Sequence, residues 1–250
     1  MTIDDKVRRA KDDLDRVYAA GREAGRADGG FGEGYEAARA ELWNGLQNGG
    51  TRTDYMYAFA YWASEYIRPT RKVVPTAPYG ANNTFYYCRS VKKIEKDYFD
   101  FSQKEYGGNG YYYTFTTCSA LETVEDIGLI PQPSYNYAFA WCIKLETIAK
   151  IGADETTTFK GTFTSCSTLK NITVEGTIGQ SVSFADSPLT ADSAISVITH
   201  LKSFHGASNA YSQTLTFSAK TWAALDALGA ASPANTTWRH YVEQELAWNT

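Results

Sequence analysis

The strongest constraint on the fold of this chain is a ten-residue pattern that recurs four times. The pattern is Phe-x-x-Cys-x-x-Leu-x-x-Ile, with Val accepted at the last two apolar positions, and each copy carries one of the four cysteines. Successive cysteines lie 30, 24 and 24 residues apart. A period of this length is typical of leucine-rich repeats, in which each copy forms one coil of a stack. The copies are residues 85–94, 115–124, 139–148 and 163–172.

Such a coil cannot bury its own apolar side chains, so each must stack on the equivalent residue of the next coil. A reduced thiol suits a buried column because it behaves as a small hydrophobe with a weak donor. A degenerate fifth copy, Phe184 to Leu189, has Ser187 in place of cysteine and resembles a terminal turn. The expected structural ladder consists of Phe85, Phe115, Phe139, Phe163, Cys88, Cys118, Cys142, Cys166, Val91, Leu121, Leu145 and Leu169.

The alternative for four cysteines is a zinc site or a redox pair. No Cys-x-x-Cys motif is present, and the periodic placement accounts for every thiol, so the buried ladder is favoured over a metal site. We expect no metal and no cofactor.

Residues 1–50 carry apolar residues in a 4-3 rhythm among charged ones, which predicts a helical, coiled-coil-like segment. Gly29 to Gly34 interrupts the rhythm and is interpreted as a hinge rather than a phosphate loop. A seam this narrow needs a partner. We therefore favour a homo-oligomer, a trimer being one option, over a helix that folds back on its own repeats. The proposed oligomerisation residues are Ile3, Val7, Leu14, Val17, Leu42 and Leu46.

The remaining chain divides at the end of the repeats. Residues 51–189 are expected to form the solenoid, with an aromatic, Pro-punctuated N-terminal cap. Residues 190–250 predict a small C-terminal α/β cap: a helix with Thr190 as N-cap, a strand at 214–218, and two further helices at 219–228 and 237–248. The expected fold is thus mainly β with α: a leucine-rich-repeat-type solenoid after a helical coiled-coil segment.

Charge and hydropathy exclude several classes of partner. The formal charge is −4, from 24 basic and 28 acidic residues, so no field attracts nucleic acid. The N-terminus is charged and lacks an apolar core, and no run of 18 apolar residues occurs. We expect neither a signal peptide nor membrane insertion.

The sequence contains no recognisable catalytic motif. Neither G-x-S-x-G, a Walker loop nor H-E-x-x-H is present. His200 and His205 are five residues apart and would not share one face of a helix. We therefore expect a non-enzymatic protein with no catalytic residues.

Tyrosine is the one feature that points to binding. Fourteen of the 18 tyrosines lie between Tyr55 and Tyr137. Exposed tyrosines provide rigid, amphipathic contact area for sugars or proteins. One hypothesis assigns Tyr111, Tyr112 and Tyr113 to such a surface; the alternative is that they pack between coils.

Residues 85–250 resemble the BspA-like leucine-rich-repeat proteins, and most closely the short bacteriophage and prophage structural type. The resemblance rests on the repeat, on the passage from Leu169 through Ser187 to Thr190, and on the tail ending at Trp248 and Asn249. It implies a virion structural protein of the tail, baseplate or fibre, assembled in the host cytoplasm with other virion proteins, with a host-surface glycan or protein as a further partner. A bacterial surface adhesin is the alternative, and a glycan-processing enzyme is a distant one.

Overall fold

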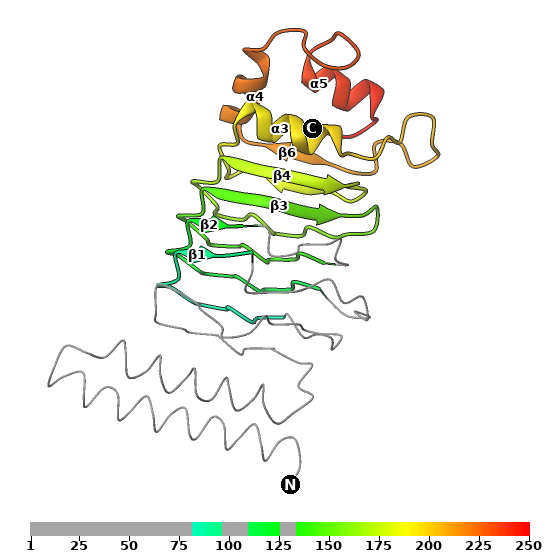
Figure 1. The fold of residues 1–250 in the computed structure, drawn as a ribbon. Helices are drawn as coiled ribbons and strands as arrows, with labels where there is room; N and C mark the ends of the chain where they lie inside the picture. Colours follow the sequence, from blue (N-terminus) through cyan, green and yellow to red (C-terminus); the bar gives the residue numbers. More distant parts are fainter. Residues whose placement is uncertain (1–81, 97–109, 126–133) are drawn as a thin grey trace, which may run out of the picture. The chain divides into compact units, whose positions relative to one another are not determined.

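The computed structural model describes residues 82–96, 110–125 and 134–250. Within them, the end of each repeat copy forms a strand that pairs in parallel with the next copy. Strands β1 (Lys93–Ile94), β2 (Thr123–Val124), β3 (Thr147–Ala153) and β4 (Asn171–Gly176) make one sheet in the order β1-β2-β3-β4. Figure 1 shows these strands following one another in chain order.

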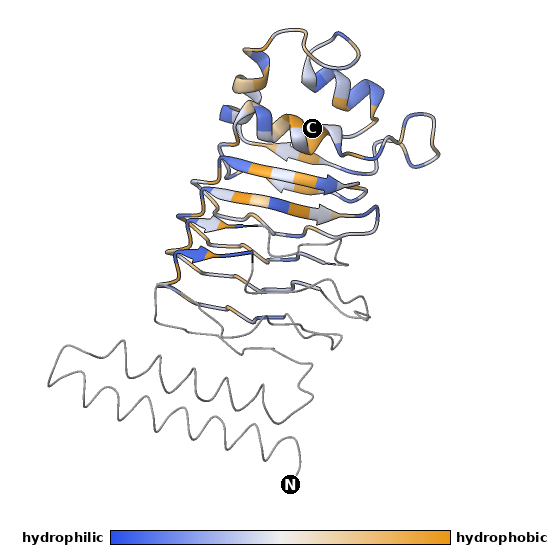
Figure 2. Ribbon diagram, in the orientation of Figure 1, coloured by the Kyte–Doolittle hydropathy of each residue, from blue (hydrophilic) through white to orange (hydrophobic). Residues whose placement is uncertain are grey.

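The register of the sheet aligns the last apolar residue of each copy. Ile94 lies opposite Val124, Val124 opposite Ile148, and Ile148 opposite Ile172. All four side chains are buried, so this column forms one wall of the core. β4 alternates between buried and exposed residues, which Figure 2 shows as alternating hydropathy. One face of the sheet therefore belongs to the core.

A column of phenylalanine rings runs through the interior. Phe85, Phe115, Phe139 and Phe163 stack with ring planes within 3° of parallel and centroids 5.2, 5.2 and 6.1 Å apart. Phe184 of the fifth copy lies 4.5 Å from Phe163 and 5.9 Å from Phe217. The fifth copy therefore does not end the column, which continues into the C-terminal region.

All four cysteines are buried free thiols that occupy equivalent places in successive copies. The Sγ of Cys118, Cys142 and Cys166 donates to the carbonyl of Phe85, Phe115 and Phe139, respectively, at 3.0, 3.0 and 3.1 Å. Ser187 takes the next place, and its hydroxyl donates to the Cys166 carbonyl at 3.2 Å.

Burial raises the pKa of the Cys118 and Cys142 thiols and raises the pKa of Cys166 to about 12. A neutral thiol is a hydrogen-bond donor, whereas a thiolate is not. The donated hydrogen bonds between copies are therefore kept at physiological pH.

Each Phe-x-x-Cys segment is a turn with one residue in the left-handed backbone region, and a second such residue precedes the turn. The residue before each cysteine has a positive φ: 60° at Tyr87, 61° at Thr117, 59° at Trp141 and 58° at Ser165. A second positive φ lies two residues before each phenylalanine, as at Tyr113, where it is 54°. The turn closes because the Cys N–H donates to the Phe carbonyl at 3.1 to 3.2 Å in every copy.

Helix α3 (Ala191–Thr199) covers the last edge of the four-stranded sheet. Its N-cap is Thr190, as the sequence predicts, and the Thr190 hydroxyl accepts from the Ser193 N–H. The backbone N–H groups of Ile172 and Val174 in β4 donate to the Ser193 and Ser196 hydroxyls at 2.9 and 3.0 Å. Serine side chains thus satisfy a strand edge that would otherwise expose unpaired donors.

The rest of the chain packs against this end. Strands β5 (Val182–Phe184) and β6 (Leu215–Phe217) pair in parallel, and helix α4 (Ala219–Asp226) follows β6 with Ser218 as its N-cap. The predicted helix at 237–248 is shorter than expected. It consists of α5 (Trp238–His240) and a π-helical turn, η1 (Tyr241–Glu245).

The last helical segment ends at Glu245, and the chain then changes direction so that Trp248 is buried outside the helix. The Leu246 N–H reaches back to the Tyr241 carbonyl, and Ala247 has a φ of 57°. Trp248 is fully buried, and its Nε1 donates to the Lys202 carbonyl at 2.7 Å. Apolar periodicity continued to Trp248, but the tertiary contact required a change of chain direction before it.

Two predictions fall outside the described residues. These are the helical segment at 1–50, with its oligomerisation residues, and the aromatic cap before residue 82.

Candidate functional site: an aromatic hollow across three repeats

The three consecutive tyrosines do not form one exposed face. Tyr111 is only 1% exposed, and its ring stacks on Tyr135 with centroids 5.3 Å apart. Tyr112 and Tyr113 are half-buried. The hypothesis of a three-residue binding face is therefore wrong at Tyr111, because this position belongs to a second interior column that continues through Tyr135 to Phe159.

Tyr113 lies on the outer side, in an aromatic cluster. Its ring stacks on Tyr137 at 5.0 Å and meets the rings of Tyr112 and Tyr86 nearly edge-on at 4.4 and 6.5 Å. Partial burial, helped by the neighbouring Tyr112 hydroxyl, raises the pKa of Tyr113. The phenol is therefore neutral at physiological pH.

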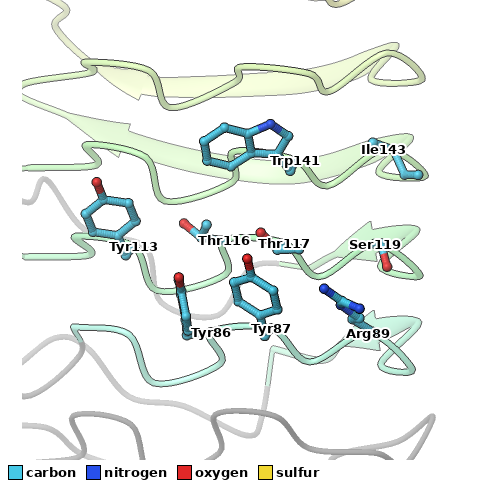
Figure 3. Close-up of a pocket in the computed structure, with 9 residues that line it drawn as sticks. All are labelled: Tyr86, Tyr87, Arg89, Tyr113, Thr116, Thr117, Ser119, Trp141 and Ile143. Atoms are coloured by element: carbon cyan, nitrogen blue, oxygen red, sulfur yellow. The ribbon is translucent and has the colours of Figure 1, made fainter.

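Beside this cluster the surface is hollowed over about 620 Å³. The hollow spans the turns of three successive copies (Figure 3). Its lining residues are Tyr86, Tyr87, Arg89, Tyr113, Thr116, Thr117, Ser119, Trp141 and Ile143.

The hollow follows from side-chain size at two turn positions. The residue before cysteine is Tyr87, Thr117 and Trp141 in the three copies, and the residue after it is Arg89, Ser119 and Ile143. The middle copy therefore has small residues between two copies with large ones. Figure 3 shows Tyr87 and Trp141 on either side of Thr117. Adjacent turns are joined directly, since the Tyr87 N–H donates to the Thr116 carbonyl and the Thr117 N–H to the Ala140 carbonyl, at 2.9 and 2.8 Å.

The two large aromatic residues that flank the hollow have a backbone conformation that large residues rarely adopt. Tyr87 and Trp141 both have a φ near 60°, a region in which Gly and Asn are preferred. The Trp141 and Ile143 side chains are nevertheless 45% and 47% exposed. Stability of the turn alone does not account for an exposed tryptophan at such a position.

Of the lining residues that the structure describes, Arg89 alone carries a formal charge. Arg89 is exposed, and its guanidinium carbon lies 4.9 Å from the centroid of the Tyr87 ring. No carboxylate is among these described residues, whose other polar side-chain groups are tyrosine, threonine and serine hydroxyls and the indole N–H of Trp141. The Thr116 hydroxyl is occupied, because it donates to the Tyr137 carbonyl.

Sequence reasoning identified tyrosine as the relevant residue type but missed the site. The hollow is formed by Tyr87 and Arg89 of one copy and Trp141 of another, with the small residues of the copy between them. Comparing the copies column by column would have revealed the alternation of large, small and large residues beside cysteine. The tripeptide Tyr111 to Tyr113 was conspicuous only because its residues are adjacent in the chain.

The two histidines considered in the sequence analysis each lie against a backbone carbonyl rather than against each other. Nδ1 of His200 lies 2.7 Å from the Ser196 carbonyl, and Nδ1 of His205 lies 3.0 Å from the Gln244 carbonyl. Over residues 82–96, 110–125 and 134–250, no group of three or more His, Cys, Asp or Glu residues is arranged to hold a metal ion. In the same ranges no helix is long and apolar enough to cross a membrane.

Comparisons with protein-family models, curated proteins and solved structures gave no match to this chain.

Proposed function

We propose that this protein is a non-enzymatic bacteriophage virion protein of the tail, baseplate or fibre, whose repeats present a recognition surface to the host. The observation that carries the proposal is the hollow between Tyr87 and Trp141. Rigid aromatic side chains supply contact area at little cost in conformational entropy, and a repeat framework holds them at set spacings. The resemblance to short phage repeat proteins supplies the biological setting.

The proposal includes a fold. The chain is a leucine-rich-repeat-type solenoid whose C-terminal end is covered by a small α/β region. In its support, four strands pair in parallel in chain order, and phenylalanine and cysteine recur at equivalent places with interior stacking and hydrogen bonding. The proposal extends to partners, which are further copies of this chain and other virion proteins.

The location is tested by electron microscopy of purified phage particles labelled with an antibody against this chain. Labelling concentrated at the tail, baseplate or fibres is the expected result. Complete absence of the chain from infectious particles contradicts the proposal.

The recognition role is tested on phage that carry Trp141→Asn. Particles should assemble in normal numbers but adsorb to host cells more slowly than the parent. Unchanged adsorption by particles that contain the variant chain removes the recognition role and leaves a purely structural one.

A further inference from the structure

We propose that the hollow binds a single acidic sugar residue of a surface glycan, packed on the exposed ring of Trp141 with its anionic group on Arg89. This inference names the ligand of the surface assigned under the proposed function, and it rests on that assignment. It is argued from the exposed aromatic ring, the hydroxyl groups and the charge of the hollow.

The hollow offers an exposed aromatic ring to a ligand. Trp141 is 45% exposed, and it lies across Thr117 from Tyr87 (Figure 3). An exposed ring of this kind can pack on the face of one sugar residue.

The lining fits a sugar better than an apolar group. The axial C–H bonds of a pyranose ring make an apolar face that packs on the π-face of Tyr or Trp, while its hydroxyls point outward around the rim. Ser119 and Thr117 supply hydroxyls in the middle copy, between the two walls. A wholly apolar ligand would leave these groups without partners in a dry contact.

The positive charge of the hollow favours a sugar residue that carries an anionic group. Among the described residues of the lining, Arg89 is the one charged side chain and none is a carboxylate. Its guanidinium is stacked near the Tyr87 ring, so the planar fork is held beside one wall of the hollow. Such a fork binds a carboxylate or sulfate through two parallel hydrogen bonds. A glycan containing uronic acid or a sulfated sugar has both the ring and the anion.

The chain itself supplies the variant that fills the hollow and the control for it. Thr117→Tyr places in the middle copy the residue that copy one already has at the same position, with φ values of 61° and 60°. Ser165→Tyr makes the same change one copy beyond Trp141, at a φ of 58° and outside the lining. Both variants are expected to fold, because the turn already accommodates tyrosine.

The test is calorimetric titration of the full chain with oligosaccharides containing glucuronate, and with the carboxyl-reduced forms of the same oligosaccharides. The wild type and Ser165→Tyr should bind the acidic form. Thr117→Tyr and Trp141→Asn should weaken that binding by roughly tenfold or more, as loss of a central contact does. Arg89→Gln should remove the preference for the acidic form over the reduced one.

Equal binding by Thr117→Tyr and the wild type overturns the inference, and so does equal affinity for acidic and reduced sugars. A panel of carboxylated and sulfated oligosaccharides that gives no binding at millimolar concentration also overturns it. If that panel fails but the Trp141→Asn phage still adsorbs poorly, only the ligand class is wrong and the recognition role stands. Normal adsorption by that phage, together with sugar binding by the wild type, removes the recognition role instead.

Discussion

The buried columns of the repeats and the turn positions beside each cysteine differ in how much the residue varies from copy to copy. The interior column has phenylalanine in every copy from Phe85 to Phe163, with nearly parallel rings. The position before cysteine holds Tyr87, Thr117, Trp141 and then Ser165, although all four have the same backbone conformation.

This difference has a physical cause. An interior side chain contacts its equivalents on both sides, so a change of shape in one copy leaves a gap or a clash in two others. An outer side chain has solvent on one side and can change size without that cost. The requirement for stability therefore keeps the same residue in every copy of a buried column, whereas the residue at the turn position can vary. The hollow is formed where the turn residue changes in size from copy to copy.

The largest effect is expected from breaking the interior column at its centre. Phe139→Ala removes a fully buried ring that stacks on two others, so the free energy of unfolding should fall by about 3 to 5 kcal/mol. Urea unfolding followed by circular dichroism measures this loss. Ile143→Ala, at a half-exposed turn position, should change it by less than about 0.5 kcal/mol. Equal losses would remove the distinction between column and turn.

Alkaline pH should weaken the cysteine column. Because the folded thiols have raised pKa values, the unfolded chain ionises first, at about pH 8.5. The stabilisation from the neutral thiols is complete below that pH. It is lost progressively as the pH rises toward the folded pKa of Cys166, about 12. In this window Cys166 contributes a loss of about 1.4 kcal/mol per pH unit.

Urea midpoints measured from pH 7 to pH 11 test this dependence. Cys166→Ala should show a shallower decline above pH 9 than the wild type, because one of the perturbed thiols is gone. Superimposable slopes for the two proteins would mean that this thiol does not titrate as its burial requires.

A smaller effect is expected from exchanging one thiol for a hydroxyl. Ser187 already follows Cys166 in the column, so Cys142→Ser should keep the donor to the Phe115 carbonyl and cost only about 1 kcal/mol of unfolding free energy. As a control, Ser165→Cys makes the reverse exchange one copy further on, at a half-buried turn position. This control should change the free energy of unfolding by less than about 0.5 kcal/mol. A loss at Cys142→Ser as large as that of Phe139→Ala would show that the thiol itself is required.

The smallest effect on stability is expected at the wall of the hollow. Trp141→Asn gives up contacts of a half-exposed ring but relieves a left-handed backbone that asparagine tolerates. The two changes oppose each other, so the unfolding free energy should move by less than about 0.5 kcal/mol. Thermal and urea unfolding measure it. A loss above about 2 kcal/mol would place Trp141 with the column residues rather than with the binding surface.

The sequence by itself determined which residues are equivalent. Periodicity does this directly, because residues one period apart occupy the same place in successive copies. It therefore grouped Phe with Phe and Cys with Cys, and it located the N-cap at Thr190 from local chemistry alone. It could not say on which side of the coil a residue outside the pattern lies, so it left open whether Tyr111 belongs to a binding surface or packs between coils, and the structure buries this residue.

Only the tertiary structure decided where the outer side chains meet. Tyr87, Thr117 and Trp141 are separated by 30 and 24 residues, and they become neighbours only when the copies lie one strand spacing apart. The same holds for the two serines of α3 that satisfy the edge of β4 and for Trp248, which leaves its helix to reach Lys202. Each depends on packing between segments far apart in the chain, which no local pattern records.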